Sequence, residues 1–234
     1  MKIVEQSIVP LKEIDGEDIL WTIEAACRLC YKSEGKNLEK DPSKRDSLIR
    51  AAVKRGHTSV LEHAAVTFRV VCNRGVSHEW VRHRVGCSYS QESTRYCNYG
   101  DDRFGNEITV IWPWYLGEPM RNLWEGDTEP HFPYIHGKLA AYIWYRHMQA
   151  CEKAYLDILE QGFKPEQARG VLPNDLKTEM IVTMNPVSLR HFLTLRCTEQ
   201  AHYQIRELAL KALSICHERI PVVFDDLYER FLKE

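Results

Sequence analysis

WVRHRVGCSYSQESTRYCNY, residues 80–99, is the stretch around which the rest of this chain is organised. Three arginines and one histidine stand in it against a single carboxylate, Glu92. An unpaired buried ion costs several kcal/mol, whereas a charge-assisted hydrogen bond to phosphate or carboxylate stabilises by roughly 1.5–3 kcal/mol. These basic side chains therefore either lie in water or hold anionic ligands.

The Arg82-His83-Arg84 triplet has two interpretations. In the first, Ser77 caps a short helix, Gly86 closes it, and the basic residues of its last turn offset the helix dipole. In the second, the triplet opens an anion site, because the hydroxyl, amide and carboxylate side chains that follow suit a hydroxylated, phosphorylated ligand. Residues two apart on a helix point in nearly opposite directions, so Arg82 and Arg84 would serve two ligands or two pockets.

Length and composition narrow the class of protein. A chain of 234 residues is expected to form one domain, residues 1–234, with a sizeable core. The formal charge of −2 argues against general affinity for nucleic acid. No segment approaches the roughly 18 apolar residues of a membrane span and the start lacks a signal-peptide core, so a cytoplasmic location is expected. Of the eight cysteines, Cys27 and Cys30 form a lone CxxC inside a helical pattern, where they fit as two small core residues on one helix face. The others are scattered, with no second CxxC and no His pair at metal spacing, which indicates reduced thiols and no metal site.

Hydrophobic periodicity predicts a mixture of helices and strands. The long helix in the middle of the chain is expected to turn Leu139 and Ile143 toward the core, and Thr198 is expected to cap the last helix. The strands are predicted at 2–10, 64–72, 108–112 and 178–184, and the helices at 17–31, 47–55, 135–159, from 165, at 187–197 and from 198 onward.

Three further segments carry candidate site residues. In HTSVLEH, residues 57–63, Ser59 and Glu62 fit a capping box, while His57 and the exposed amides equally fit an anion site. Arg169 stands just before the breakers that end its short helix. Arg196 closes the predicted helix at 187–197, where a basic last turn also suits the helix dipole.

These segments together resemble a known family. RHR followed by SYSQESTRY, then HTSVLEH, QARGVLP, MNPVSLRHFLTLR and EQAHYQIRE, resemble the motifs of flavin-dependent thymidylate synthases over nearly the whole chain. Two departures stand out. Eight residues rather than seven separate Arg84 from Ser93, with Gln91 replacing the more usual acid, and Val187 stands where some members have a flavin-contacting arginine.

The resemblance implies a fold and a reaction. The fold is an α+β single domain, with a twisted, mainly antiparallel sheet flanked by long helices, assembled as a homotetramer. The enzyme converts dUMP to dTMP with tightly bound FAD, taking the one-carbon unit from 5,10-methylenetetrahydrofolate and reducing the flavin with NADPH. The reduced flavin supplies the hydride, so no cysteine need attack the pyrimidine.

The resemblance also assigns residues to these ligands. Arg196 is the catalytic residue at the uracil edge, where its positive charge would stabilise negative charge on the ring. The FAD-binding residues are His57, Ser59, Glu62, Arg82, His83, Arg84, Val85, Asn185 and His191. The residues that bind dUMP are Glu79, Arg82, Gln91, Glu92, Ser93, Thr94, Arg95, Arg169 and Arg196.

Two other functions remain open from the residues alone. A binding module for RNA or another polyanion would use the same arginines as a basic aromatic patch, and would show salt-sensitive affinity without a chromophore. An inactive relative would keep only the fold. Retention of Arg95, Arg169 and Arg196 argues against the second, because a scaffold has no need for three converging cations.

Overall fold

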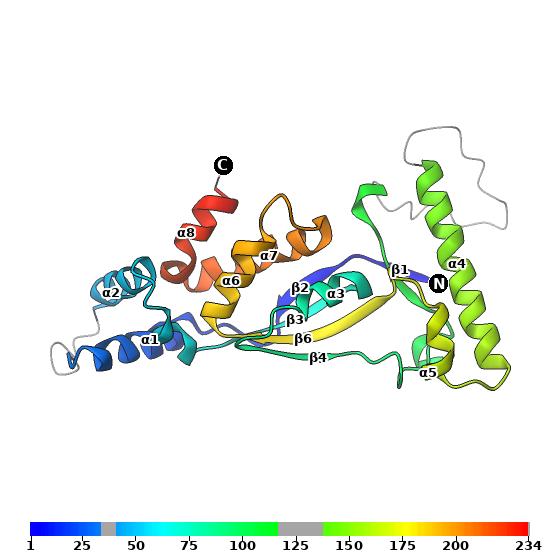
Figure 1. The fold of residues 1–234 in the computed structure, drawn as a ribbon, viewed down its shortest axis with the longest axis horizontal. Helices are drawn as coiled ribbons and strands as arrows, with labels where there is room; N and C mark the ends of the chain where they lie inside the picture. Colours follow the sequence, from blue (N-terminus) through cyan, green and yellow to red (C-terminus); the bar gives the residue numbers. More distant parts are fainter. Residues whose placement is uncertain (34–40, 117–137, 234) are drawn as a thin grey trace. The chain divides into compact units, whose positions relative to one another are not determined.

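The computed structural model describes residues 1–33, 41–116 and 138–233 and divides the chain into two compact units (Figure 1). Each unit is assembled from three separate segments of the chain. The single domain expected over residues 1–234 stays a prediction. Unit 1 comprises Met1–Gln6, Val71–Ser77 and Gln91–Glu179, and unit 2 comprises Ser7–Val70, His78–Ser90 and Met180–Glu234.

A four-stranded sheet has the strand order β2-β3-β6-β4. Strand β6 is antiparallel to β4, since Asn185 N donates to Gly86 O while Glu92 N donates to Glu179 O, so residue numbers rise on one strand as they fall on the other. The mixed α and β architecture with an antiparallel sheet is therefore as predicted. The strands are β2 (Ser7–Pro10), β3 (Val66–Asn73), β4 (Cys87–Gln91) and β6 (Lys177–Met184).

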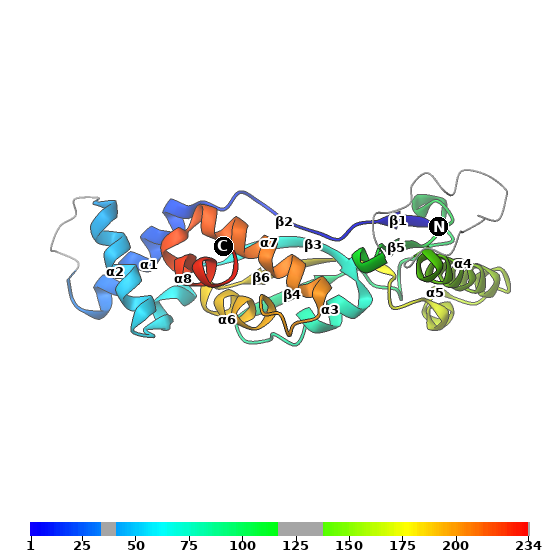
Figure 2. The same ribbon diagram turned by 90° about the horizontal axis from the view of Figure 1, so that it is seen from above.

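Alternation along the two central strands gives the sheet one buried face. Val66, Phe68, Val70 and Cys72 of β3 are each at most 2% exposed, as the period of two predicted. In unit 2, helix α7 (Tyr203–Arg219) contacts β2 and lies over the strands in both views (Figures 1 and 2). The apolar face of the strands is therefore buried beneath helix.

Within unit 2, α7 packs against α6 (Pro186–Arg196) and against the helix that follows it in the chain. Leu61, Phe192 and Phe224 are completely buried in this unit. Pro221 begins α8 directly after α7 ends, so the last predicted helix is in fact two. The remaining elements are α1 (Gly16–Cys30), α2 (Pro42–Lys54), the 3-10 helix η1 (Thr58–His63) and α8 (Pro221–Phe231), while α3 (Arg74–Trp80) begins in unit 1 and ends in unit 2.

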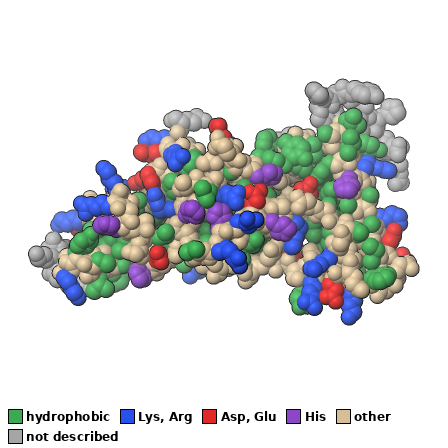
Figure 3. Space-filling view, viewed as in Figure 1, with side chains coloured by type: hydrophobic (Ala, Val, Ile, Leu, Met, Phe, Trp, Pro, Cys, Tyr) green, Lys and Arg blue, Asp and Glu red, His purple; other side chains and the backbone are tan. Residues whose placement is uncertain are grey.

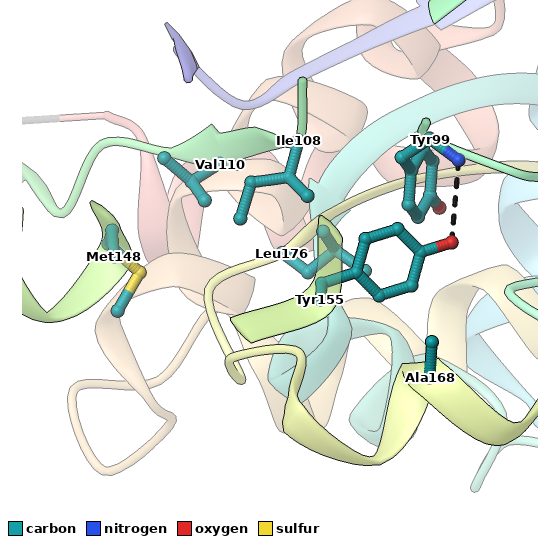
Figure 4. Packing of buried hydrophobic residues seen from close by; sticks show 7 residues of the cluster. All are labelled: Tyr99, Ile108, Val110, Met148, Tyr155, Ala168 and Leu176. Carbon is teal, nitrogen blue, oxygen red and sulfur yellow. Dashed lines mark hydrogen bonds between the residues drawn. The ribbon is translucent and has the colours of Figure 1, made fainter. Parts of the chain in front are cut away.

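Unit 1 is built around the long helix α4 (Lys138–Glu160). Its strands β1 (Lys2–Val4) and β5 (Thr109–Ile111) pair in parallel, and α5 (Pro165–Ala168) follows α4. The hydroxyl of Tyr155 accepts from Tyr99 N at 3.4 Å inside the apolar core (Figure 4). That core consists of Tyr99, Ile108, Val110, Met148, Tyr155, Ala168 and Leu176.

Three predictions near the chain termini were wrong. The strand predicted at 2–10 is two strands in two sheets, because a change of pairing partner leaves no mark on an alternating pattern. The helix predicted at 47–55 begins at Pro42, where the side chain of Asp41 accepts from two backbone amides. The helix predicted from residue 198 onward begins at Tyr203 as α7, and the hydroxyl of Thr198 donates to Leu195 O instead of capping that helix.

The core-facing side of α4 was also predicted wrongly. Leu139 and Ile143 are 53% and 60% exposed, whereas Ala141, Met148 and Tyr155 are buried. Apolar residues occur on more than one side of this helix, so spacing alone could not select the buried one. The predicted loop up to residue 133 and the helix start at 135 lie outside the described residues. Within the described ranges, no helix combines the length and apolarity needed to cross a membrane.

Candidate active site

Helix α6 is the element of unit 2 on which the candidate site is assembled. Asn185 caps it, accepting from Ser188 N at 2.8 Å, and Pro186 occupies the first turn, where a missing N–H costs nothing. The helix ends at Arg196, as predicted. One predicted FAD contact, Asn185, thus begins this helix and the predicted catalytic arginine ends it.

The basic triplet follows α3 in a turn, so both the expected last-turn position and the helical directions inferred for it were wrong. Ser77 does not cap α3 either. Asn73 does, accepting from Val76 N at 2.8 Å, while the Ser77 hydroxyl donates back to Arg74 O. A side-chain acceptor ahead of the helix competes better for the free amides than a hydroxyl within it.

Two contacts hold the turn at residues 81–86 against α6. Trp80 stacks on Phe192 with ring centroids 4.1 Å apart, and the Ser188 hydroxyl donates to Val85 O at 2.6 Å. Gly86 has φ +64° and lies so close to α6 that a Cβ there would be 2.5 Å from Nδ2 of Asn185. The expectation that Gly86 adopts the left-handed conformation is confirmed, although it closes a turn rather than a helix.

Tyr89 fixes the shape of the turn from β4. Its hydroxyl lies 2.8 Å from Trp80 O and 2.6 Å from His83 O, so one phenol bridges two carbonyls of the same loop. From the sequence, Tyr89 was one of the hydroxyl-bearing residues expected to suit a phosphorylated ligand, whereas its hydroxyl is bonded to backbone here. An aromatic residue next to a polar stretch carries no signal that its hydroxyl reaches backbone six and nine positions away.

Arg196 meets the segment that precedes and includes the triplet. Its Nη1 donates to Oε2 of Glu79 at 2.6 Å, and its Nε donates to Nε2 of His83 at 3.0 Å. A third, longer bond runs from Nη2 to Glu79 O at 3.4 Å. Predicted residues from two motifs, Glu79 with His83 and Arg196, are therefore brought together within unit 2.

His83 is neutral in this arrangement. An arginine donates to its Nε2, so that nitrogen must be the acceptor and the ring proton lies on Nδ1. Burial, followed by the charges of Arg196 and His191, lowers the pKa of His83 to about 4. The ring also packs edge-on against Phe192, with centroids 5.0 Å apart. His83 is held here as an acceptor, so it adds no positive charge.

The two arginines on either side of His83 are open to solvent, as is Val85 after them. Arg82 and Arg84 are exposed, and neither guanidinium has an ion pair or side-chain hydrogen bond with another described residue. Val85 is 89% exposed. On the face drawn in Figure 3, basic and histidine side chains gather in the region where Figure 1 places α6. These unpartnered cations are available to an anionic ligand.

The HTSVLEH segment forms η1, which packs against α6 and α1. The capping box expected from Ser59 and Glu62 is absent: His57 stands at the N-cap position and no side chain caps this helix. A 3-10 turn does not present its amides as an α-helix does. Instead His57 Nδ1 lies 3.2 Å from the hydroxyl of Tyr31, and His57, Ser59 and Glu62 are exposed.

His191 lies on the exposed side of α6, with its ring centroid 6.1 Å from that of His83. Val187 is half-buried in the first turn of the same helix. The predicted FAD-binding residues of unit 2 therefore come from η1, from the turn after α3 and from α6.

The remaining predicted substrate residues lie in unit 1. Nε2 of Gln91 donates to Ser77 Oγ at 3.0 Å and to Thr178 Oγ1 at 3.1 Å. Glu92 accepts from Tyr99 at 2.7 Å and from Lys177 at 3.0 Å. Both side chains thus have partners inside the unit, and local sequence patterns do not reveal such partners.

The two arginines predicted to bind dUMP in unit 1 are Arg95 and Arg169. Arg95 donates to Glu166 at 2.7 Å, and Arg169 stands three positions after Glu166 at the end of the same helical turn. Arg169 is exposed, and its guanidinium has no ion pair or side-chain hydrogen bond with another described residue. Thr94 is buried, and Ser93 Oγ accepts from Arg95 N at 3.3 Å. The turn at 165–171 thus pairs with Arg95 through Glu166 and carries the exposed Arg169.

Comparison with known proteins shows the family of the chain. The family described as "Thymidylate synthase complementing protein" matches residues 16–222. The chain belongs to this family. It is 37% identical over 207 residues to the "Flavin-dependent thymidylate synthase" of Geobacter sulfurreducens, covering 86% of this chain and 78% of that protein. It is 31% identical over 235 residues to the enzyme of the same name from Thermosipho melanesiensis, covering 99% and 93%.

A solved structure shares the fold. The UMP/dUMP methylase PolB from Streptomyces cacaoi, solved with 5-Br dUMP, superposes with a TM-score of 0.77 at 22% identity, covering 100% of this chain and 99% of that one. The resemblance inferred from the motifs is confirmed at the level of the thymidylate synthase complementing protein family.

Two cysteines near the motifs, Cys87 and Cys197, do not have the character of nucleophiles. All eight cysteines are free. Burial raises the pKa of Cys87, and it raises that of Cys197 to about 12, so both thiols stay protonated near neutral pH. Among the described residues, no three or more His, Cys, Asp or Glu side chains are grouped so that they could hold a metal ion.

The residues present fit an anionic cofactor such as FAD. A pyrophosphate needs guanidinium groups that are not already neutralised, and Arg82 and Arg84 meet that condition among the described residues. Arg196 donates three of its five N–H groups to Glu79 and His83, which leaves two for a ligand.

Proposed function

We propose that this chain is a flavin-dependent thymidylate synthase that converts dUMP to dTMP. The observation that carries the proposal is Arg196, held by Glu79 and His83 beside two unpartnered arginines, in a chain whose relatives bear that name. The dUMP methylase with the same fold supports a nucleotide substrate.

The proposal extends to the co-substrates. FAD is tightly bound, 5,10-methylenetetrahydrofolate gives the one-carbon unit, and NADPH reduces the flavin. When bound, the flavin supplies the hydride that completes the methyl group. The proposed FAD ligands are His57, Ser59, Glu62, Arg82, His83, Arg84, Val85, Asn185 and His191, with Arg82 and Arg84 the groups that would pair with phosphate.

The chain's own residues bind and polarise the nucleotide. In unit 1, Arg169 supplies positive charge suited to the nucleotide phosphate, and Arg95 would do so on exchanging its bond to Glu166 for one to the phosphate. In unit 2, Arg196 uses its two remaining N–H groups at the pyrimidine edge. A fixed guanidinium there stabilises negative charge as it develops on the ring and costs no reorganisation in the transition state. The protonated Cys87 takes no covalent part.

We further propose that residues 1–234 act as one catalytic domain in a cytoplasmic homotetramer. The apolar side chains of Leu139 and Ile143, more than half exposed on α4, give a neighbouring subunit an apolar surface to cover. Light scattering of the purified protein measures the oligomeric state. A monomer at micromolar concentration would contradict the tetramer.

The test of function combines a spectrum with a product assay. Flavin absorbance bands that bleach with NADPH in the absence of oxygen and are perturbed by dUMP are expected, followed by dTMP formation when methylenetetrahydrofolate is added. The Arg196→Ala variant should retain FAD and lose most turnover. A colourless protein that binds no added FAD would favour the polyanion-binding interpretation, and normal turnover of the variant would contradict the role of Arg196.

A further inference from the structure

The bonds of Arg196 within unit 2 separate it from the other arginines assigned to ligands. Its acceptors all come from one short segment, the Glu79 carboxylate, the Glu79 carbonyl and the His83 ring. The Arg196 and Glu79 side chains are 21% and 29% exposed, so this contact is partly shielded from water. By contrast, Arg82 is exposed and without such partners among the described residues.

We propose that Glu79 is a positioning residue that acts on the nucleotide through Arg196, and that it does not itself contact the nucleotide. This inference rests on the proposed function and changes the role that the family resemblance gives to Glu79. Three donors on one planar group, bound to three acceptors on one loop, fix both the place and the plane of the guanidinium.

The Glu79 carboxylate is bonded to Arg196 through one oxygen, and its other oxygen lies beyond hydrogen-bond distance of the nearest histidine nitrogen. Oε2 accepts from Arg196 at 2.6 Å, and Oε1 lies 3.9 Å from Nδ1 of His202. A carboxylate that turned away to contact a uracil would leave the guanidinium without its shortest bond. His83 cannot replace it, because its single acceptor nitrogen is already used by Arg196 Nε.

The seating of the turn on α6 makes this position rigid. The Val85–Ser188 bond and the Trp80–Phe192 stack hold the segment from Glu79 to Gly86 against the helix that carries Arg196. Helix and loop thus form one support for the guanidinium. Its two remaining N–H groups then point in directions set before any ligand arrives, and a small displacement of such a group costs much of its effect.

A double-mutant cycle tests the assignment. We expect Glu79→Ala to lower kcat for dTMP formation by on the order of 100-fold, with the KM for dUMP changed little. In the Arg196→Ala background the same change should have almost no further effect, because the group through which Glu79 acts is gone. Glu79→Gln keeps an acceptor oxygen for Nη1 and should recover most of the loss.

Outcomes of this cycle separate the two proposals. Losses that multiply in the double variant, or a Glu79→Ala variant with raised KM and unchanged kcat, would overturn the positioning role and favour direct contact with dUMP. Wild-type protein that forms no dTMP under the full assay would instead overturn the proposed function.

A spectroscopic measurement keeps the inference testable without turnover. In ¹⁵N-labelled protein, the Nε–H of Arg196 should exchange slowly with water, since it is bonded to His83 at a partly shielded position. The Arg196→Lys variant identifies the signal. In Glu79→Gln that signal should persist, and in Glu79→Ala it should exchange much faster. A signal equally protected in Glu79→Ala would show that Glu79 does not hold Arg196.

Discussion

Replacing Gly86 with alanine should destabilise unit 2 more than the same change at another left-handed glycine. Gly86 has φ +64°, a conformation that L-residues adopt at a cost of roughly 1–2 kcal/mol. Its Cβ would also lie 2.5 Å from Nδ2 of Asn185 and closer still to Oγ of Ser188. Both side chains must then move, although each makes a hydrogen bond in the native structure.

The size of the effect follows from those two side chains. Displacing Ser188 removes its bond to Val85 O, worth about 1 kcal/mol, and displacing Asn185 removes the cap of α6, worth about 1 kcal/mol more. Together with the backbone cost, Gly86→Ala should lower the free energy of unfolding by about 3–4 kcal/mol. The turn that carries Arg82 and Arg84 would lose its seat on α6.

Urea unfolding followed by tryptophan fluorescence measures this loss, with Gly56→Ala as the matched control. Gly56 has φ +71° in the same unit, but its added Cβ would meet no atom within 4 Å. The control should therefore lose only the backbone cost of roughly 1–2 kcal/mol. Equal losses in the two variants would refute the idea that the turn is locked against α6, and would leave only the strain of the left-handed conformation.

Three further changes probe the same site. His83→Gln should remove an acid-dependent loss of stability. Because folding lowers the pKa of His83 from 6.5 to about 4, the wild type should lose at most about 3 kcal/mol of unfolding free energy as pH falls from 6.5 to 4, whereas glutamine does not titrate. Identical pH profiles of unfolding for the two proteins would contradict this. Tyr89→Phe should lower the free energy of unfolding by about 1–2 kcal/mol, because two carbonyls lose their hydrogen-bond donor. The control Tyr96→Phe, at an exposed position, should change it by less than about 0.5 kcal/mol. Equal effects of the two changes in thermal melts would count against the hydrogen bonds of the Tyr89 hydroxyl to the two carbonyls. Cys87→Ala should keep kcat within a few-fold of wild type, and complete loss with FAD still bound would point to covalent catalysis by this thiol.

Local sequence patterns correctly predicted the buried face of a strand and the end of a helix. Alternation placed Val66, Phe68, Val70 and Cys72 on the buried face of β3, because a strand exposes alternate side chains whatever its partner is. The end of α6 at Arg196 was predicted for a similar reason. These features depend on residues within a few positions of one another.

Errors arose where two local solutions compete. Asn73 rather than Ser77 caps α3, since several polar residues near a helix start could bond a free amide. The Thr198 hydroxyl donates to the carbonyl of Leu195, and α7 begins at Tyr203 without any side-chain cap. Leu139 and Ile143 looked like core residues because a helix that is apolar on more than one side does not reveal which side will be covered.

The sequence by itself determined the motif order, the family and the identity of the arginines that could meet anions. Only the tertiary structure decided which of them are free. Glu79 and Arg196 stand 117 positions apart, and their charges alone do not show that they pair while Arg82 stays open. Periodicity records which side of an element is buried, whereas the partner of a charged group depends on which elements the fold packs together. For that reason the fold, rather than the motif, separates an arginine held by other side chains from arginines that are not.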